Sequence, residues 1–253
     1  MKHQQALVLV TGASSGIGFA VAQELASSGR YHVLIGARTF TKAETAIEQL
    51  VADPAFPVTR TALSPVALDL TSDASIAAAA QSVTDQFGSL DVLINSAGVS
   101  TGGADIGLRD NFRFVFETNV FGAAVLINSF LPLLRASTYR DRRIVNVTSG
   151  AGQIGLALSP DDRYNASGIP APVYRSSKAA LNMITAVHSM LLADEGITTM
   201  VAAPGPTRTR FSTGRGEKEV HEGARPIIRA ATEGDPKKLN GTLVADELTE
   251  YGW

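Results

Sequence analysis

Three glycines that follow the first apolar segment constrain the fold of this chain more than any other feature of the sequence. Residues 6–11 (Ala-Leu-Val-Leu-Val-Thr) form a short apolar run that predicts a strand, and residues 16–28 predict a helix. The two are joined by Thr11-Gly-Ala-Ser-Ser-Gly-Ile-Gly18. A glycine trio alone marks many turns, but its position after the first strand and before the first helix indicates a phosphate-binding turn.

Each of the three glycines has its own predicted task. Gly12 permits a tight turn, Gly16 removes a Cβ where the backbone must approach a pyrophosphate, and Gly18 lets the helix pack closely on the sheet. The helix N-terminus presents free N–H groups and the positive end of its dipole to the phosphates. The residues of this turn that we expect to contact a dinucleotide cofactor are Gly12, Ser14, Ser15, Gly16, Ile17 and Gly18.

The rest of the chain alternates short apolar runs with helical stretches. The apolar runs are nearly continuous, as expected for strands whose sheet is covered by helices on both faces. This order predicts an α/β fold with a doubly wound parallel sheet of about seven strands, the Rossmann fold. The predicted strands are residues 6–11, 32–37, 65–69, 91–95, 143–148, 198–203 and 242–245, and the predicted helices are residues 16–28, 41–52, 72–87, 108–135 (bent or ended near Pro132) and 173–194.

The 253 residues fit one large α/β domain over 1–253, although the length alone would also allow two small domains. There is no internal repeat and no linker that would divide the chain. Two polar stretches, residues 153–171 and 205–223, interrupt the alternation. They are either surface loops or the rim and lid of a pocket, and we favour the second interpretation because each follows the carboxyl end of a strand. We therefore expect substrate-loop segments near residues 150–172 and 205–225.

Composition excludes several classes of function. The formal net charge is -2 and neither half of the chain is strongly basic, so nucleic acid is not an expected partner. No apolar run approaches the roughly 20 residues that span a bilayer, and the apolar run near the start is too short for a secretory signal. We therefore expect a cytoplasmic protein with no membrane partner. The absence of cysteine excludes disulfides, cysteine-ligated metals and thiol nucleophiles, and four scattered histidines predict no metal site.

The end of the second predicted strand indicates which dinucleotide binds. A NAD-binding chain carries an Asp or Glu roughly 20 residues beyond the glycines to hold the ribose 2′-hydroxyl. Here no acidic residue lies between Glu24 and Glu44, and the strand ends in Ile35-Gly-Ala-Arg38. Arg38 is either a solvated surface residue or the cationic partner of a 2′-phosphate. Since the expected acid is also missing, we predict NADP(H) as the cofactor, with Ser14 and Ser15 adding hydroxyl donors.

Tyr174 and Lys178 are four residues apart at the start of a predicted helix and so share one helix face. A phenol with a pKa of about 10 is a sluggish acid or base, and lowering that pKa to about 7 takes about 4 kcal/mol of preferential phenolate stabilisation. We expect the nearby ammonium and the positive nicotinamide of an oxidised cofactor to supply it. Ser149 follows the strand at 143–148, where its hydroxyl would hold a substrate carbonyl near the phenol. Taken singly, the Tyr/Lys pair also suits an exposed helix and Ser149 also suits a turn.

Together these motifs make the chain resemble a short-chain dehydrogenase/reductase of the single-domain type, over nearly its whole length. Ser96 stands where the family usually has Asn, a mild change at a structural turn. The gap from Ser149 to Tyr174 is longer than usual and resembles the insert of carbonyl-reductase-like members. Such an insert suits a monomer but also suits subunit contacts, so a monomer and a homo-oligomer (dimer or tetramer) both stay open. The matching motifs, in the family's order, are residues 11–18, Asn95-Ser-Ala-Gly98, Asn119-Val-Phe-Gly122, Ser149, Tyr174 with Lys178, and Pro204-Gly-Pro-Thr-Arg-Thr209.

The resemblance implies a role for each matching position. Tyr174 would be the general acid in reduction and the general base in oxidation, while Ser149 orients the substrate oxygen. Lys178 would lower the Tyr174 pKa and bind the nicotinamide ribose, and Asn119 would hold a water that links Lys178 to solvent. Asp69 and Leu70 would flank the adenine, and Thr207 and Thr209 would meet the carboxamide. Besides the glycine turn, the implied cofactor-binding residues are Arg38, Asp69, Leu70, Asn95, Ala97, Gly98, Tyr174, Lys178, Pro204, Gly205, Thr207 and Thr209.

The expected activity is NADPH-dependent reduction of a ketone or aldehyde in a small-to-medium organic substrate, or the reverse oxidation of an alcohol. Reduction is favoured because NADP pools in cells are mostly reduced. Two alternatives remain. An NADP(H)-binding regulatory protein with little turnover would be expected to lack Tyr174 or Lys178, and both are present. A biosynthetic cyclase or isomerase with the same fold depends on the shape of the pocket.

Overall fold

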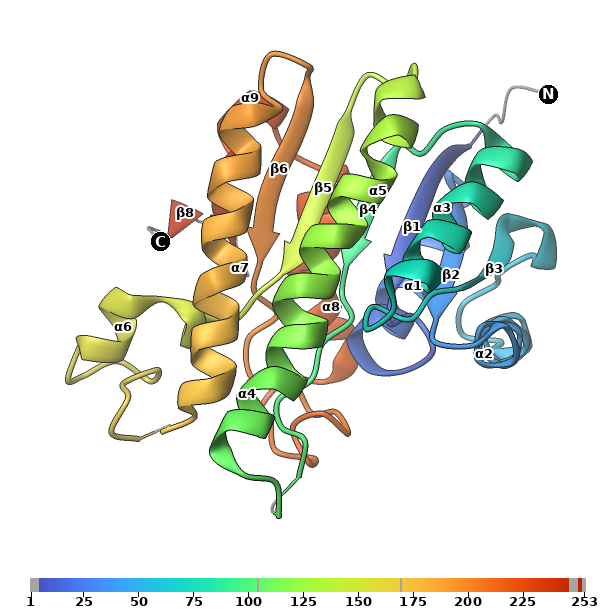
Figure 1. Cartoon of the computed structure of the whole chain (residues 1–253). Helices are drawn as coiled ribbons and strands as arrows, with labels where there is room; N and C mark the ends of the chain where they lie inside the picture. The colour runs from blue at the N-terminus through green and yellow to red at the C-terminus, as the bar shows by residue number, and fades with distance from the viewer. Residues whose placement is uncertain (1–4, 104, 169, 246–249, 252–253) are drawn as a thin grey trace.

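The computed structural model describes residues 5–103, 105–168, 170–245 and 250–251, and it is organised around one eight-stranded sheet (Figure 1). In spatial order the strands are β3, β2, β1, β4, β5, β6, β7 and β8. The first seven strands in the sequence are parallel, as predicted, and β8 pairs antiparallel with β7 at the edge. The bounds are β1 (Ala6–Thr11), β2 (Tyr31–Ala37), β3 (Leu63–Ala67), β4 (Val92–Asn95), β5 (Arg142–Val147), β6 (Ile197–Ala202), β7 (Leu243–Val244) and β8 (Glu250–Tyr251).

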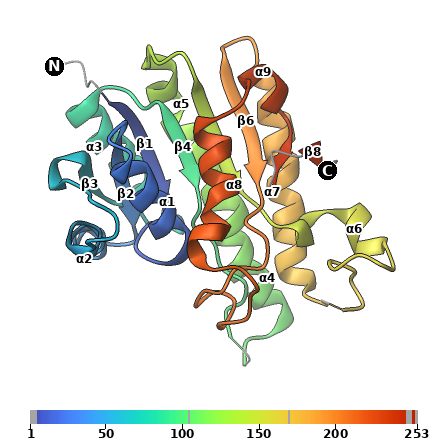
Figure 2. The same ribbon diagram turned by 180° about the vertical axis from the view of Figure 1, so that it is seen from behind.

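Helices cover both faces of this sheet. One face carries α3 (Asp73–Phe87), α4 (Leu108–Phe116), α5 (Ala123–Ala136) and α7 (Pro172–Leu191), which stand in front of the strands in Figure 1. The other face carries α1 (Gly16–Ser27), α2 (Phe40–Ala52) and α8 (Val220–Thr232), which are nearer the viewer in Figure 2. The predicted Rossmann fold is therefore confirmed. Short helical turns complete the described structure: η1 (Arg60–Ala62), the π-helix η2 (Glu117–Gly122), η3 (Gly150–Gly152), α6 (Ile154–Leu158) and α9 (Pro236–Leu239).

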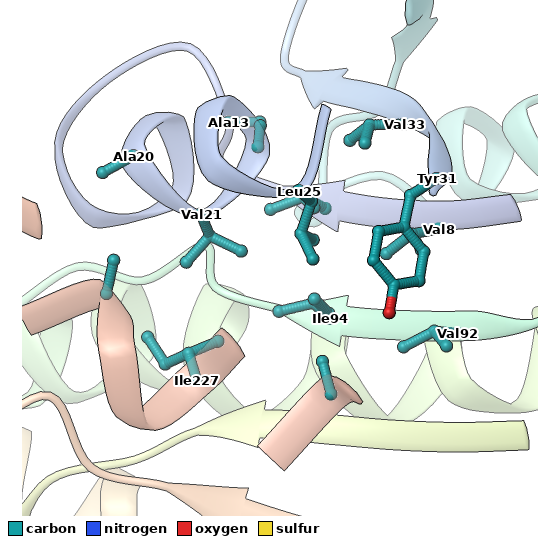
Figure 3. Close-up of a cluster of buried hydrophobic side chains, with 14 of the residues drawn as sticks. Val8, Ala13, Ala20, Val21, Leu25, Tyr31, Val33, Val92, Ile94 and Ile227 are labelled. Atoms are coloured by element: carbon teal, nitrogen blue, oxygen red, sulfur yellow. The ribbon is translucent and has the colours of Figure 1, made fainter. Parts of the chain in front are cut away.

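The hydrophobic core has two layers because successive side chains of a strand point to opposite faces of the sheet. Along β1, Val8 and Val10 face the layer beneath α1, α2 and α8, whereas Leu7 and Leu9 face the layer beneath α3 and α5. Figure 3 shows the first layer, where Val21 and Leu25 of α1 and Ile227 of α8 gather over the strands. Burial on both faces explains why the strands are apolar throughout and not alternating.

The predicted helix over residues 108–135 is interrupted in the structure. It consists of α4, the π-helix η2 and α5. Pro132 lies inside α5 and does not end it, because the helix continues to Ala136. By length and composition alone the stretch Leu108–Ala136 could cross a membrane, which is weak evidence. Half of its most apolar window is buried, and Leu126, Ile127 and Phe130 belong to the core beneath the sheet.

Helix α8 was not predicted. Residues 205–223 were expected to form a surface loop or the rim and lid of a pocket, with no helix after them, whereas in the structure a helix begins at Val220. Its signal is a capping box, in which Glu219 and Glu222 reciprocally accept hydrogen bonds from backbone N–H groups of the first turn. Pro226 lies inside the helix and makes the segment resemble a loop in the sequence, because proline usually ends a helix.

The order of the strands reverses between β1 and β4, and ligands of open α/β sheets bind beside such a reversal at the carboxyl ends of the strands. Hydrogen bonds hold the segments at this edge together. The Ala97 N–H after β4 donates to Thr11 Oγ1 at the end of β1 over 3.0 Å. The Thr148 N–H after β5 donates to the Ala202 carbonyl at the end of β6 over 2.9 Å. The predicted site residues therefore meet on a shared edge.

Candidate active site

The glycine turn after β1 adopts a backbone that explains two of its glycines. Gly12 has φ +66°, and a Cβ added there would lie 2.9 Å from the Ala97 Cα. A Cβ at Gly18 would lie 2.7 Å from the Gly12 carbonyl oxygen, so α1 packs directly on the turn. Gly16 has φ +60°, and its nearest neighbour at the Cβ position is the Thr209 methyl group at 3.8 Å. The loop after β6 therefore borders the turn after β1.

The start of α1 is suited to bind phosphate. Its N-cap residue is Ser15, whose side chain makes no capping hydrogen bond. The first-turn N–H groups of a helix have no partner within the helix, so they and the helix dipole are available to an anion. Ser14 is half-buried and Ser15 is exposed beside them. This turn fits the diphosphate of a dinucleotide.

Arg38 lies next to the same turn. The Ala13 N–H donates to the Gly36 carbonyl over 3.1 Å, which places the end of β2 beside the glycine turn. Arg38 follows two residues later and is exposed, and among the described residues it forms no ion pair. Its guanidinium can therefore bind an anionic group of a ligand held on the turn.

Asp69 and Leu70, after β3, differ in what they contact. Leu70 is buried in the core, and its carbonyl oxygen would lie only 2.1 Å from a Cβ added to Gly122 of η2. Asp69 is half-buried, and its carboxylate accepts hydrogen bonds from the Thr71 N–H and hydroxyl. Leu70 therefore packs mainly against η2, whereas Asp69 stands at the sheet edge.

Tyr174 and Lys178 project from the first turns of α7, which begins with Pro172 at its first position. The Tyr174 phenol is within hydrogen-bonding reach of the Ser149 hydroxyl. Ser149 is the N-cap residue of η3, and its side chain accepts a hydrogen bond from the Ala151 N–H over 3.1 Å. The Lys178 ammonium donates to the Val147 carbonyl over 2.8 Å and lies 5.9 Å from the centre of the Tyr174 ring. The three predicted catalytic groups of β5 and α7 thus converge.

The pKa of Tyr174 in the protein alone is raised, whereas the lowered value was expected with an oxidised nicotinamide bound. Burial raises it to about 12, and a smaller contribution from the negative charge that Tyr164 can carry adds to this, while the Ser149 hydrogen bond lowers it. Burial also lowers the pKa of Lys178 to about 8. In the protein alone, desolvation of the phenolate is the largest influence on this pKa. Tyr174 is therefore protonated at neutral pH.

Asn119 lies in the π-helix η2 and connects two neighbouring segments. Its side-chain oxygen Oδ1 accepts a hydrogen bond from the Val99 N–H over 2.8 Å. Its side-chain nitrogen Nδ2 donates to the Val99 carbonyl over 2.8 Å and to Ser177 Oγ over 3.0 Å. A Cβ on Gly98 would lie 3.3 Å from Asn119 Oδ1 and 3.6 Å from Lys178 Nζ. Asn119, Gly98 and Lys178 are therefore together, with the Asn119 side chain anchoring the loop after β4 to α7.

The loop after β6 turns its first threonine inward. Thr207 is buried, its hydroxyl lies 3.2 Å from the Gly205 carbonyl, and it contacts Gly223 of α8. Thr209 is half-buried beside Gly16. Gly205 has φ +74° and follows the buried Pro204. Of the two threonines, Thr209 is the one whose side chain borders the glycine turn.

A buried polar chain beneath the site was not anticipated. The Asn95 amide donates to Asn146 Oδ1 over 2.7 Å, and the Asn146 amide donates to Thr185 Oγ1 over 2.8 Å, which links β4, β5 and α7. Asn95 Oδ1 is buried and has no hydrogen-bond partner among the described residues. Thr148 donates to Asn182 Oδ1 nearby. Asn146 is a polar residue inside an apolar strand, and that was the available signal, because buried amides require hydrogen-bond partners.

These features identify the family when they are compared with known proteins. The family model described as short chain dehydrogenase matches residues 6–220. This chain belongs to the short-chain dehydrogenase family. It is an oxidoreductase, and the fold of the family binds a nicotinamide cofactor, which the open start of α1 and the glycine turn fit.

Relatives of this short-chain dehydrogenase cover nearly all of its length. Short-chain dehydrogenase anuI of Penicillium roqueforti is 55% identical over 250 residues, which are 98% of this chain and 97% of that protein. Short-chain dehydrogenase/reductase eupG of a Phoma species is 34% identical over 98% of this chain and 92% of that protein. Among solved structures, carbonyl reductase from chicken fatty liver with bound NADPH has a TM-score of 0.81 and 29% identity, covering 99% of this chain and all of that one. The predicted carbonyl-reductase-like resemblance is thereby supported in three dimensions.

Proposed function

We propose that this short-chain dehydrogenase is an NADPH-dependent carbonyl reductase in which Tyr174 is the general acid. The observation that carries the proposal is the convergence of Ser149, Tyr174 and Lys178, with the Ser149 hydroxyl near enough to the phenol to lower its pKa and the buried Lys178 ammonium donating to the Val147 carbonyl. All three lie at the carboxyl edge of the sheet, where Lys178 is also next to Gly98 and Asn119. We also propose that residues 1–253 act as one catalytic domain, since the site residues predicted from sequence border this one edge.

The proposed reaction assigns a step to each side chain. Ser149 and Tyr174 hold the carbonyl oxygen of the substrate by hydrogen bonds. When bound, the reduced nicotinamide supplies a hydride to the carbonyl carbon. Tyr174 gives its phenolic proton to the oxygen as negative charge develops there, and the product is an alcohol. Lys178 holds the ribose of the cofactor, and its charge stabilises the phenolate that remains until a solvent proton restores the phenol.

The protonation state of Tyr174 supports the reductive direction. A phenol with a pKa raised to about 12 carries its proton at neutral pH and can donate it as soon as the oxygen becomes basic. The reverse oxidation needs a phenolate, which burial disfavours in the protein alone. A positively charged oxidised nicotinamide would reduce that cost, so oxidation is expected to require higher pH than reduction.

Arg38 supports NADP(H) as the cofactor. It is a cation without an ion-pair partner among the described residues, beside a turn suited to diphosphate, and no acidic residue follows β2 before α2 begins. An acidic residue there would bind a ribose 2′-hydroxyl, whereas a guanidinium binds a 2′-phosphate. The 29%-identical carbonyl reductase with bound NADPH agrees with this assignment.

Replacing Tyr174 by Phe tests the proposal directly. The ring and its edge-to-face contact with Phe211 are kept, and only the proton donor is lost. We expect kcat for ketone reduction to fall about 1000-fold, the typical contribution of a positioned general acid, with unchanged NADPH affinity. Stopped-flow NADPH oxidation and calorimetric cofactor titration measure the two. Near-full turnover in Tyr174→Phe would refute the acid assignment. If the wild type oxidises no NADPH across a broad panel of carbonyl compounds, a binding role would be favoured instead.

A further inference from the structure

Tyr164 lies at the active site although it belongs to the long segment between β5 and α7. A Cβ added to Gly150 would lie 2.3 Å from Tyr164 Cε2 and 2.5 Å from its Cζ, so the hydroxyl-bearing end of the ring rests on the residue after Ser149. The Tyr164 phenol is also close enough to Tyr174 to affect its pKa. Tyr164 therefore lies beside the two residues, Ser149 and Tyr174, that would hold a substrate carbonyl.

The position of Tyr164 is held on several sides. Its N–H donates to the Asp162 carboxylate over 2.7 Å, and its carbonyl accepts from the Arg175 guanidinium over 2.7 Å. Arg175 is buried and directly follows Tyr174 in α7, so the proton donor and Tyr164 share one support. The Arg163 guanidinium lies 5.8 Å from the centre of the Tyr164 ring. An aromatic residue held in this way loses little conformational entropy when it contacts a ligand.

A second aromatic residue reaches Tyr174 from the loop that precedes α8. The rings of Phe211 and Tyr174 have centres 5.6 Å apart in an edge-to-face arrangement, and Phe211 is 45% exposed. The α6 segment and the loop before α8 lie on the two sides of the start of α7 in both views (Figures 1 and 2). The ion pair of Arg163 and Glu217, at 2.7 Å, connects them. Tyr174 is thus bordered by an aromatic ring from each loop.

We propose that Tyr164 and Phe211 select substrates in which a planar unsaturated ring is conjugated to the carbonyl group. This inference rests on the proposed function and specifies its substrate class. A carbonyl held by Ser149 and Tyr174 places its substituents next to the two rings that border the phenol. An aryl substituent gains edge-to-face or stacked contacts with them, which a saturated ring of the same size lacks. Aryl ketones and aryl aldehydes are therefore the preferred substrates.

A pair of unreactive amides tests this selection without turnover. Benzamide and cyclohexanecarboxamide both offer a carbonyl oxygen to Ser149 and Tyr174, and they differ in whether the six-membered ring is aromatic or saturated. Their affinities are measured by calorimetry on the protein saturated with NADP⁺ or NAD⁺, whichever binds more tightly. We expect benzamide to bind about fivefold more tightly, as about one aromatic contact provides. Equal affinities, or no binding of benzamide, would overturn the proposal.

Four variants separate ring recognition from a change in the fold. Tyr164→Leu and Phe211→Leu should each reduce the preference for benzamide about threefold while leaving cyclohexanecarboxamide binding unchanged. Tyr164→Phe retains the ring and should retain the preference. Tyr139→Leu removes an exposed aromatic residue between α5 and β5, remote from the site, and should behave as the wild type. A preference that persists in both leucine variants at the active site would contradict the inference.

Turnover assays then distinguish failure of this inference from failure of the proposed function. The wild type, Tyr164→Leu and Phe211→Leu are compared on acetophenone and cyclohexyl methyl ketone. If the wild type reduces both ketones and the ratio of their kcat/KM values is unchanged in the variants, the reductase assignment stands and the substrate class is wrong. If no compound of a broad carbonyl panel is reduced but benzamide keeps its preference, the pocket is as inferred and the reductase assignment fails.

Discussion

The two halves of the sheet's carboxyl edge are built in different ways. After β1, β2 and β3 the connections are short, at residues 12–15, 38–39 and 68–72, and Gly12 and Gly18 allow close backbone contact. After β5 and β6 they are long, at residues 148–171 and 203–219, and contact each other through side chains such as the Arg163–Glu217 pair. The first half is suited to the cofactor, which is the same for many related enzymes. The second half is suited to the substrate, because the sequence and length of long loops can change without disturbing the strands.

The contrast between the two halves is tested most strongly by two glycines. Gly12→Ala places a side chain at φ +66° and 2.9 Å from the Ala97 Cα, so we expect a loss of about 3 kcal/mol in the free energy of unfolding and loss of cofactor binding. Gly155→Ala in α6 meets no atom within 4 Å, and we expect a change within about 0.5 kcal/mol or a small gain. Urea unfolding and cofactor titration check both. If Gly12→Ala kept the stability and the cofactor affinity of the wild type, the distinction between the halves would be lost.

Substitutions of two arginines, one in each half, test which half determines the cofactor preference. Arg38→Glu should lower the ratio of kcat/KM for NADPH to that for NADH by about 100-fold, because a charge-assisted contact with the 2′-phosphate is replaced by repulsion. Arg163→Gln, in the long loop after β5, should leave this ratio unchanged. Steady-state kinetics with both cofactors provide the measurement. An unaltered ratio in Arg38→Glu would overturn the assignment of NADP(H).

The buried lysine between the halves predicts a dependence of stability on pH. Below pH 8 Lys178 is charged in both states, and the folded protein bears the full cost of burying it. Between about pH 8 and 10.5 the unfolded chain retains a proton that the folded protein has lost, so the free energy of unfolding rises with pH. From pH 7 to 10 we expect the wild type to gain about 2 kcal/mol more than Lys178→Met. Chemical unfolding at both pH values measures this.

A matched control is available for the pH experiment. Lys42 is exposed in α2, so Lys42→Met should follow the wild type across the same range. Above pH 10 the raised pKa of Tyr174 acts in the opposite direction, because the unfolded chain then loses the phenolic proton first. A Lys178→Met variant that gains as much stability as the wild type would show that the lysine is not titrating as the structure indicates.

The smallest effect is expected where the two long loops meet. The Arg163–Glu217 ion pair is exposed, so a double-mutant cycle with Arg163→Gln and Glu217→Gln should give a coupling close to the experimental error. The coupling should decline further in 1 M salt. Thermal unfolding of the four proteins at low and high salt measures it. A large coupling that persists in 1 M salt would mean that the loops form a rigid unit comparable to the glycine half.

The sequence predicted the seven parallel strands well because they are mostly apolar, a pattern that follows from burial on both faces. The edge strand β8 was not predicted. The prediction of helices failed where two local signals conflict. No helix was predicted at α8 because Pro226 lies inside it, although Glu219 and Glu222 mark its start. Pro132 suggested that α5 would bend or end there, but the packed helix continues to Ala136. The π-helix η2 has no clear sequence signal, but Gly122 is required there by its close approach to Leu70.

For the site, sequence placed Ser149, Tyr174 and Lys178 correctly beside one another, since the ends of β5 and the start of α7 must meet at the sheet edge. The lowered Tyr174 pKa was expected with the oxidised nicotinamide bound, and it stays a prediction. In the protein alone burial raises this pKa, and the depth of burial does not follow from a spacing of four residues. The support of Tyr164 by Arg175 was also unpredictable, because the contact depends on how a long loop folds back.

The anchoring of that loop by Arg175 has a consequence for protein engineering. Among its described residues, the connection between Gln153 and Pro172 contributes no strand to the sheet, and the carbonyl oxygen of Tyr164 accepts a hydrogen bond from the Arg175 guanidinium. A backbone carbonyl is common to all residue types, so the anchor makes no demand on the side chain at position 164. Segments of other lengths and compositions are therefore candidates for transplantation at this point, provided that each returns a carbonyl to Arg175.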